Sequence, residues 1–213
     1  MENILVVGAN GTTGKEIVSL LKASDHFNPV AMVRERHQVD QFKHKRIDTV
    51  LGDLTKDLSH VTDNIDKVIF AAGSGGKKVV EVDQEGAKSL IDVSKKANVK
   101  RFVMLSSMGA DQPEAADDLE AYLQAKQNAD EYLKASGLNY VIVRPGALNN
   151  EDGTGKIELN QKLNKQGEIS RVDVAHTLVN ALDDDTPSNV TFEILQGETG
   201  IEKAFNSLKQ TTN

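Results

Sequence analysis

A tyrosine and a lysine with the spacing of a proton-transfer pair occur in the sequence as Tyr122 and Lys126. Residues four positions apart in a helix lie one turn apart on the same face, so a phenol and an ammonium at this spacing can share a site. A lysine beside a tyrosine favours the phenolate, which lets the tyrosine give and take a proton near neutral pH. The alternative is an ordinary amphipathic helix. Asp130 falls near the same face, so the two charges could also lie at a solvent-exposed edge.

Two serines, Ser106 and Ser107, directly follow the strand-like apolar run of residues 102–105. Ligands of a parallel α/β sheet bind at the carboxyl ends of its strands, and a serine hydroxyl placed there can donate a hydrogen bond to a substrate carbonyl. The Ser-Ser-x-Gly sequence is also suited to a plain loop, so these residues fit either interpretation.

Three glycines, Gly8, Gly11 and Gly14, stand between the buried-strand run of residues 4–7 and a helical pattern that reaches residue 23. The first can take a tight turn, the second lets backbone N–H groups approach a pyrophosphate, and the third lets the helix pack close to the strand. The helix N-terminus then faces the anion. The motif predicts dinucleotide binding, although its spacing is G-x-x-G-x-x-G rather than G-x-G-x-x-G. The residues of this turn expected at the cofactor are Gly8, Asn10, Gly11, Thr12, Thr13 and Gly14.

The type of dinucleotide depends on the end of the second strand, residues 29–33, where an acid would bind the ribose 2′-OH and an arginine would accept a 2′-phosphate. Arg34 follows this strand. Its guanidinium offers a permanently charged, bidentate fork, so Arg34, with Arg36 as a second candidate, favours NADP over NAD. The same residues fit a solvated charged turn, and Glu35 could itself bind a ribose.

Length and composition limit the other possibilities. A chain of 213 residues fits one α/β domain better than two. The formal net charge of −7 argues against a nucleic-acid partner, which would need a basic face. The chain has no cysteine and its five histidines lack ligand spacing, so we expect no metal site. It opens in a core strand without a leader and has no long apolar segment, which predicts a soluble, cytoplasmic protein without a membrane partner.

Strand-like runs alternate with helical patterns along most of the chain, which predicts an α/β fold with a doubly wound parallel sheet. The strands are expected over residues 3–8, 29–33, 48–51, 67–72, 101–106 and 139–144, and the helices over 14–23, 82–97 and 119–135. Beyond residue 147 we expect short strands near 156–159 and 167–170, a helix over 172–182, a strand over 190–195 and a closing helix near 200–208. The whole chain, 1–213, is predicted to be one domain, with a dinucleotide-binding core over about 1–147 and a small substrate-side cap over about 148–213.

Taken together, the motifs resemble those of the short-chain dehydrogenase/reductases, specifically the short atypical members related to the NmrA-like and NAD(P)-dependent epimerase/dehydratase groups. The resemblance covers nearly the whole chain and is specific because its marks occur in order. These marks are Gly8, Gly11 and Gly14, Arg34, Gly52-Asp53-Leu54, Ala71-Ala72-Gly73, Val82-Asp83, Leu105 to Ala110, Tyr122 with Lys126, Arg144-Pro145-Gly146 and Ile169 to Ala175.

The resemblance implies a Rossmann fold and a role for each matching residue. Tyr122 would be the catalytic acid/base, Lys126 would hold the ribose and tune that tyrosine, and Ser107, or with less support Ser106, would orient the substrate carbonyl. The remaining cofactor contacts implied are Asp53 and Leu54 at the adenine, Ala71, Ala72 and Gly73 along the nicotinamide-side ribose, and Pro145, Gly146 and Leu148 beside the nicotinamide.

One departure bears on catalysis. Where many members of the family carry an asparagine on the helix after the fourth strand, this chain has Asp83, as the atypical group usually does. Members of that group often have an incomplete active site, and some bind the dinucleotide without turnover, so the resemblance supports cofactor binding more strongly than catalysis. The activity that it implies is that of an NADP(H)-dependent oxidoreductase, which exchanges a hydride with a small carbonyl, quinone or flavin-like substrate. Two alternatives stay open: a non-catalytic NADP(H)-binding redox sensor, and an epimerase or dehydratase that returns the hydride. We expect a monomer or a homodimer.

Overall fold

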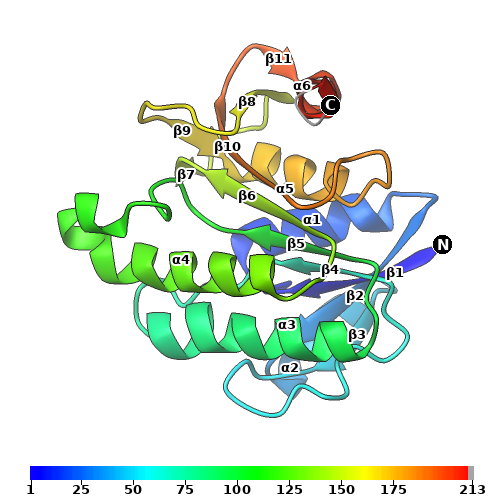
Figure 1. Cartoon of the computed structure of the whole chain (residues 1–213). Coiled ribbons are helices and arrows are strands. Elements are labelled where there is room, and N and C mark those ends of the chain that lie inside the picture. Colours follow the sequence, from blue (N-terminus) through cyan, green and yellow to red (C-terminus); the bar gives the residue numbers. More distant parts are fainter. Residues whose placement is uncertain (211–213) are drawn as a thin grey trace.

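The computed structural model describes residues 1–210, which form a twisted nine-stranded sheet with helices on both faces (Figure 1). The strands of this sheet are β1 (Glu2–Val7), β2 (Phe27–Val33), β3 (Asp48–Leu51), β4 (Lys67–Phe70), β5 (Arg101–Leu105), β6 (Tyr140–Pro145), β8 (Lys156–Asn160), β10 (Val190–Gln196) and β11 (Thr199–Gly200). The helices are α1 (Thr12–Lys22), α2 (Arg36–Lys43), α3 (Ala87–Lys96), α4 (Glu120–Ala135), α5 (Arg171–Asn180) and α6 (Ile201–Gln210). Shorter elements are the π-helix η1 (Val79–Gly86), the 3₁₀ helices η2 (Pro113–Ala115) and η3 (Asp117–Leu119), and a separate pair of strands, β7 (Ala147–Asn149) and β9 (Glu168–Ser170).

The sheet has the strand order β11-β8-β10-β6-β5-β4-β1-β2-β3. All strands from β10 to β3 run parallel to their neighbours, whereas β8 pairs antiparallel with both β10 and β11. The strand order reverses between β1 and β4, which is where ligands of open α/β sheets bind. The predicted α/β fold with a doubly wound parallel sheet is confirmed.

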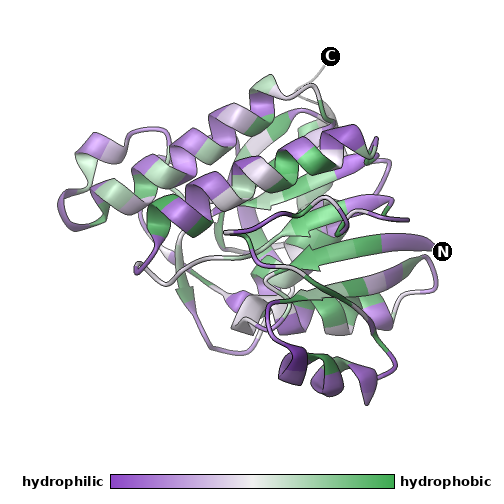
Figure 2. Cartoon of the chain, turned by 90° about the horizontal axis from the view of Figure 1, so that it is seen from below, coloured by the Kyte–Doolittle hydropathy of each residue, from purple (hydrophilic) through white to green (hydrophobic). Residues whose placement is uncertain are grey.

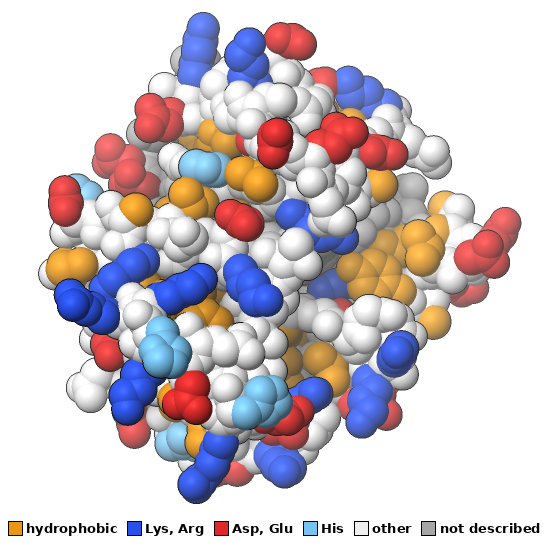
Figure 3. All heavy atoms as spheres, turned by 180° about the vertical axis from the view of Figure 1, so that it is seen from behind, with side chains coloured by type: hydrophobic (Ala, Val, Ile, Leu, Met, Phe, Trp, Pro, Cys, Tyr) orange, Lys and Arg blue, Asp and Glu red, His pale blue; other side chains and the backbone are white. Residues whose placement is uncertain are grey.

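Burial on both faces explains the continuous apolar runs of the central strands. In β1, Ile4 and Val6 belong to the hydrophobic cluster that includes residues of α1 and α5, while Leu5 and Val7 belong to the cluster under α3 and α4. Figure 2 shows the result as green strands enclosed by helices whose outer surfaces are purple. On the face of the molecule in Figure 3, acidic and basic side chains both occur across the surface.

Most of the predicted elements occur within a few residues of their expected bounds. The expected helix over 82–97 is divided, because it begins as the π-helix η1 and continues as α3. Helix α2 was missed, since its sequence shows only two apolar residues, Val39 and Phe42, after a segment that was interpreted as a charged turn. Strands β7 and β11 were also missed, because two or three residues are too few to show a period.

The part of the chain after residue 147 contributes to the central layers of the fold. Strand β10 pairs with β6 as the next parallel strand, and helix α5 packs against α1. Two buried cations at the amino ends of the strands hold the segment that joins α5 to β10. Lys67 Nζ lies 2.7 Å from Asp184 Oδ1 and donates to Leu182 O, and the Arg101 guanidinium donates to the carbonyls of residues 181, 183 and 186. This connection lies at the opposite end of the strands from the glycine turn.

Candidate cofactor and active site

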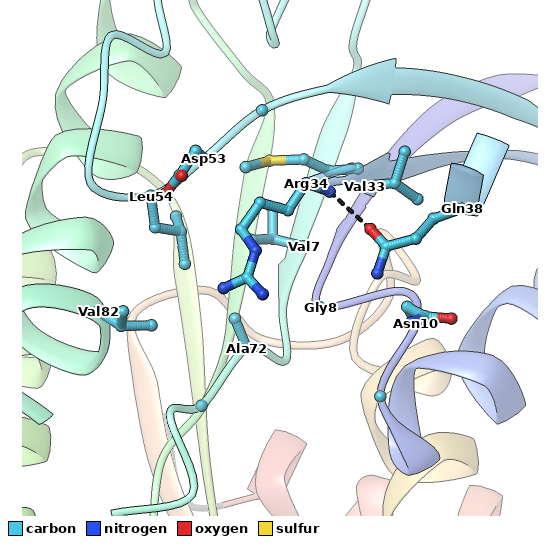
Figure 4. Close-up of a pocket in the computed structure, with 14 residues that line it drawn as sticks. Val7, Gly8, Asn10, Val33, Arg34, Gln38, Asp53, Leu54, Ala72 and Val82 are labelled. Atoms are coloured by element: carbon cyan, nitrogen blue, oxygen red, sulfur yellow. Dashed lines mark hydrogen bonds between the residues drawn. The ribbon is translucent and has the colours of Figure 1, made fainter. Parts of the chain in front are cut away.

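A cavity of about 370 Å³ opens at the carboxyl ends of β1, β2 and β4, beside the glycine turn (Figure 4). Eight of the predicted cofactor residues line it, namely Gly8, Asn10, Gly11, Arg34, Asp53, Leu54, Ala72 and Gly73. Six further lining residues were not predicted: Val7, Met32, Val33, Gln38, Gly52 and Val82. Val7 and Val33 are the last residues of β1 and β2, directly before Gly8 and Arg34. They could have been predicted from the rule that ligands bind at the carboxyl ends of the strands. Gly52 and Val82 were among the marks of the family resemblance but were given no role, and Val82 reaches the cavity from η1.

The glycine turn has the close packing that its motif predicts. Gly8 has a φ of 89°, and a Cβ there would lie 2.7 Å from Ala71 O. A Cβ on Gly14 would lie 2.1 Å from Gly8 O, so no side chain fits where α1 crosses the turn. Gly11 differs, because its φ is −71° and its Cβ would meet only Gly8 O, at 3.2 Å. Folding therefore requires glycine at positions 8 and 14 and tolerates a small side chain at position 11.

The first turn of α1 leaves backbone donors available for an anion. Gly11 is its N-cap residue, and within the described chain no side chain caps this end of the helix. Thr12 is exposed and Thr13 is buried at the start of the helix. The Oδ1 atom of Asn10 is buried and has no hydrogen-bond partner among residues 1–210. The uncapped N–H groups are suited to a phosphate group, which would accept hydrogen bonds from them, whereas Asn10 Oδ1 is itself an acceptor and would need a donor.

Arg34 extends from the end of β2 across the cavity towards Ala72 (Figure 4). Its guanidinium is largely exposed and lies 3.5 Å from the carboxylate of Glu35, which also lies 3.3 Å from His37 Nδ1. Arg36 does not line the cavity. The structure thus separates the two arginines that the sequence offered for a 2′-phosphate, and it gives Glu35 two basic neighbours.

Asp53 and Leu54 form the wall of the cavity that follows β3. The carboxylate of Asp53 accepts hydrogen bonds from the backbone N–H of Thr55 at 3.0 Å and from its hydroxyl at 2.8 Å. These bonds, with the backbone one largest, lower the pKa of Asp53 below its ordinary value. The carboxylate is therefore a fixed, ionised acceptor beside an apolar surface made by Leu54 and Val82.

Lys126 lies inside the protein, and its partner is Asp83. Only 3% of Lys126 and 1% of Asp83 are exposed, and Lys126 Nζ lies 3.4 Å from Asp83 Oδ1. The same ammonium donates to Leu105 O at 3.4 Å. The other oxygen of Asp83 accepts a hydrogen bond from the backbone N–H of Ser74 at 3.0 Å. Asp83 therefore links the lysine of α4 to the loop after β4, which contains the cavity-lining residue Gly73.

Tyr122 is half-buried, and Lys126 Nζ lies 5.6 Å from the centre of its ring. Its hydroxyl forms no hydrogen bond within the described part of the chain. Ser107 Oγ, beyond the end of β5, donates only to the carbonyl of Met108, at 3.1 Å. The hydroxyl of Ser106 instead points inwards and donates to Asp130 Oδ2 at 2.8 Å. The structure thus places Tyr122 and Lys126 together and leaves Ser107 as the more accessible of the two serines.

The alternative that Lys126 and Asp130 lie at a solvent-exposed edge is wrong, because both are buried and each has a different partner. Asp130 accepts hydrogen bonds from Arg144 Nε at 3.0 Å and Nη2 at 2.8 Å. Burial raises the pKa of Asp130, and the charge and hydrogen bonds of Arg144 oppose that rise. Arg144 Nη1 also lies 3.7 Å from Asp111, whose carboxylate pairs with Lys162 Nζ at 2.6 Å. This polar chain joins α4, β6 and the loop after β8.

Pro145, Gly146 and Leu148 lie outside the cavity, where β6 passes into β7. The position of this segment is set by backbone packing: a Cβ on Gly146 would lie 2.4 Å from Gly167 O. Arg171 donates to Leu148 O at 3.2 Å, so the first residue of α5 anchors β7. The buried carboxylate of Asp173, one turn into α5, accepts hydrogen bonds from the backbone N–H groups of residues 154 and 155. Arg171 and Asp173 therefore hold β7 and the loop before β8 in place.

Most of the predicted residues thus fall into two groups that Asp83 connects. The first lines the cavity or lies in the adjoining turns, and the second comprises Tyr122 and Lys126 in the first half of α4 and Ser107 just after β5. Pro145, Gly146 and Leu148 belong to neither group. Among residues 1–210, no three histidine, aspartate or glutamate side chains are arranged to hold a metal ion. The described helices include none of the length and apolar character that crossing a membrane requires.

A glycine turn between a buried strand and a helix, a cavity at the point where the strand order reverses, and a buried lysine define a dinucleotide-binding protein of the Rossmann class. The family described as NAD(P)H-binding matches residues 8–185. The chain belongs to this family, and the predicted NAD(P)-binding Rossmann relationship is confirmed.

Similar proteins extend over the full length of the chain. A Bacillus subtilis (strain 168) protein named as the uncharacterized sugar epimerase YhfK is 37% identical and covers 96% of this chain and 99% of its own. A Bacillus halodurans structure assigned to the NAD-dependent epimerase/dehydratases has 38% identity and a TM-score of 0.92, over 99% of this chain and 100% of that one. The structure of the oxidoreductase ylbE from Lactococcus lactis has 32% identity and a TM-score of 0.89, over 98% and 97% of the two chains.

Proposed function

We propose that this protein is an NADP(H)-dependent oxidoreductase that exchanges a hydride with a small carbonyl, quinone or flavin-like substrate. The observation that carries the proposal is the buried Asp83–Lys126 pair, which joins a tyrosine–lysine pair on one helix to the wall of a nucleotide-sized cavity. A pure binding protein needs the cavity, and Lys126 for the ribose, but has no need of Tyr122 and Ser107. The L. lactis relative is named an oxidoreductase, which agrees with the proposal.

The residues that line the cavity support the binding of NADP(H). Gly11, the N-cap residue of α1, leaves its backbone free of a Cβ atom, and the uncapped N–H groups there would hold the pyrophosphate, with Asn10, Thr12 and Thr13 around it. Arg34 would bind the 2′-phosphate. Asp53 and Leu54 would hold the adenine, and Ala71, Ala72, Gly73 and Lys126 the nicotinamide-side ribose. Pro145, Gly146 and Leu148 would lie beside the nicotinamide.

The chemistry that bound NADPH supplies is hydride transfer. The chain's own residues would manage the proton and the oxygen of the substrate. Ser107 would orient a substrate carbonyl by donating a hydrogen bond, since Ser106 is already bound to Asp130. Tyr122 would give its proton to the oxygen as negative charge develops there. Lys126, held by Asp83, would stabilise the phenolate that remains.

An epimerase or dehydratase is the second candidate, and the names of the B. subtilis and B. halodurans relatives favour it. Such an enzyme oxidises its substrate transiently and returns the hydride, so it consumes no NADPH overall. Steady oxidation of NADPH with a carbonyl, quinone or flavin acceptor therefore supports the oxidoreductase. Turnover of a substrate with no net change in absorbance at 340 nm, the NADPH band, supports the epimerase.

The test of the site is Tyr122→Phe, which keeps the ring and removes only the hydroxyl. If Tyr122 is the acid/base, NADPH affinity should survive and turnover should fall by roughly 10²- to 10⁴-fold. Tyr132→Phe is the matched control, because Tyr132 lies on the same helix and its hydroxyl bonds only to Asp92 at the surface. Full activity in Tyr122→Phe would withdraw the assignment of Tyr122 and leave the cofactor assignment intact.

The cofactor preference is tested by Arg34→Ala against Arg36→Ala. Losing a charge-assisted pair costs roughly 1.5–3 kcal/mol, so Arg34→Ala should weaken NADPH binding by about ten- to a hundred-fold. NADH affinity should change little, and Arg36→Ala should leave both affinities unchanged because Arg36 lies outside the cavity. Equal losses for NADPH and NADH would assign Arg34 to the architecture of the turn instead.

A further inference from the structure

Gln38, in the first turn of α2, has a side chain whose orientation is fixed by two backbone groups. Its Oε1 accepts hydrogen bonds from the backbone N–H of Arg34 and of Glu35, both at 3.0 Å. A backbone N–H can only donate, so the atom that both of them meet must be the amide oxygen rather than the amide nitrogen. The Nε2 group is therefore directed away from the backbone of residues 34 and 35.

The amide nitrogen faces the same cavity as Arg34. Gln38 lines that cavity together with Arg34 and Asn10. Figure 4 shows Nε2 on the side of the amide that is turned towards Gly8 and Asn10, while the oxygen is bonded to Arg34 N. No residue of the described chain accepts a hydrogen bond from this nitrogen. Gln38 thus presents two N–H donors at the edge of the space into which the Arg34 guanidinium extends.

We propose that Gln38 is a second specificity residue for the 2′-phosphate of NADP(H), donating hydrogen bonds from Nε2 to phosphate oxygens beside Arg34. The inference rests on the proposed binding of NADP(H). Arg34 has a neighbouring anion, since its Nη2 lies 3.5 Å from Glu35. A phosphate must compete with that carboxylate for the guanidinium, so a donor that does not take part in the Arg34–Glu35 pair adds to the selection of a 2′-phosphate.

Glutamine suits position 38 because its Nε2 group is the part of the side chain that would distinguish NADP(H) from NAD(H). A glutamate at position 38 could still accept from the backbone N–H groups of Arg34 and Glu35, because Gln and Glu serve equally in this helix-start arrangement. It would present a negative oxygen to the cavity in place of the NH₂ group. That oxygen would repel a 2′-phosphate and could accept a hydrogen bond from a ribose 2′-OH.

The experiment is a titration of Gln38→Glu and of the unmodified protein with NADPH and NADH, followed by cofactor fluorescence, and with adenosine 2′,5′-bisphosphate and 5′-AMP, followed by calorimetry. We expect Gln38→Glu to weaken NADPH and the bisphosphate by about ten- to a hundred-fold. NADH and 5′-AMP should bind as well as before or better. The control is Gln41→Glu, which makes the same change in charge on the exposed side of the same helix, outside the cavity. It should leave all four affinities unchanged.

Thermal unfolding of Gln38→Glu should match that of the unmodified protein. A second variant, Gln38→Ala, removes the donor without adding a charge, and it should lower NADPH affinity several-fold with a smaller effect on NADH. If both variants keep the affinity and preference of the unmodified protein for NADPH, the role of Gln38 is overturned while the proposed function stands. If the unmodified protein binds neither dinucleotide, or binds both equally, the proposed NADP(H) preference fails at that step, and the role of Gln38 fails with it.

Discussion

Removal of Arg144 should destabilise the protein strongly, because it leaves the buried carboxylate of Asp130 without a counter-charge. Asp130 is fully buried, and two of its three hydrogen bonds come from the Arg144 guanidinium, with Ser106 giving the third. Arg144→Met keeps an apolar side chain of similar length and removes the charge. Breaking a buried ion pair from one side costs about 3–5 kcal/mol. For a chain of this size, that cost corresponds to a fall in melting temperature of roughly 6–20 °C.

The dependence on pH identifies the cause. Burial already raises the pKa of Asp130, and loss of Arg144, which opposes that rise, should raise the pKa further. A carboxyl group with a raised pKa binds its proton in the folded state at a pH where the unfolded chain is still ionised, so the folded state gains stability as the pH falls. The difference in unfolding free energy between Arg144→Met and the unmodified protein should therefore be largest above the folded-state pKa and should shrink on acidification.

The assay is urea unfolding at several pH values, with Arg36→Met as a control for loss of an exposed arginine. Adding Asp130→Leu to Arg144→Met should recover much of the lost stability, because an apolar pair of similar volume can replace a buried ion pair. Asp111 keeps its pairing with Lys162 in both variants. The reasoning is refuted if Arg144→Met unfolds within about 0.5 kcal/mol of the unmodified protein, or if the deficit is the same at every pH.

Three further variants test the other conclusions. Gly14→Ala should lower the free energy of unfolding by roughly 1–3 kcal/mol or more, measured in urea, since its Cβ would lie 2.1 Å from Gly8 O. Gly11→Val should weaken NADPH binding with a much smaller loss of stability, because a Cβ at this position meets only one atom, and calorimetry beside thermal unfolding separates the two effects. Lys67→Met should destabilise the protein most at neutral pH. The hydrogen bond from Lys67 lowers the pKa of Asp184, and the stability gained from that shift is lost as the pH falls through the folded-state pKa. The free energies of unfolding of Lys67→Met and of the unmodified protein, measured in urea, should therefore become more similar at acidic pH.

Local sequence signals were sufficient for most strands of the sheet and for the glycine turn. The alternation of buried strands and helices depends on hydrophobic periodicity, which is a property of neighbouring residues. Gly8 and Gly14 were predictable for the same reason, since a left-handed φ and the close crossing of strand and helix arise within one short segment. The limit of such signals is visible in α2, whose two apolar residues did not suffice to mark it as a helix.

The partners of the charged side chains were decided by the tertiary structure. Tyr122 and Lys126 could be identified on one helix face, but the ion pair of Lys126 with Asp83 joins residues 43 positions apart. The same face carries Asp130, which is bound by Arg144 of β6 and by Ser106. Hydrophobic periodicity indicates which face of a helix a residue occupies, but it does not indicate which residues of other elements pack against that face. Whether Lys126 and Asp130 lie at a solvent-exposed edge or in buried ion pairs could therefore be decided only from the packing of α4 on the sheet.

The sequence by itself determined the class of fold and the nucleotide-binding turn, because both follow from short-range spacing and from the rule that strand ends form the site. The resemblance to a known family added Asp53, Leu54, Ala72 and Gly73 to the predicted cavity residues. Only the tertiary structure decided that Arg34 rather than Arg36 lines the cavity, that the Gln38 amide turns its donors into it, and that Asp83 holds Lys126. The physical reason is that hydrogen bonds and ion pairs have strict requirements of distance and direction, and segments distant in sequence acquire these only when the sheet brings them together.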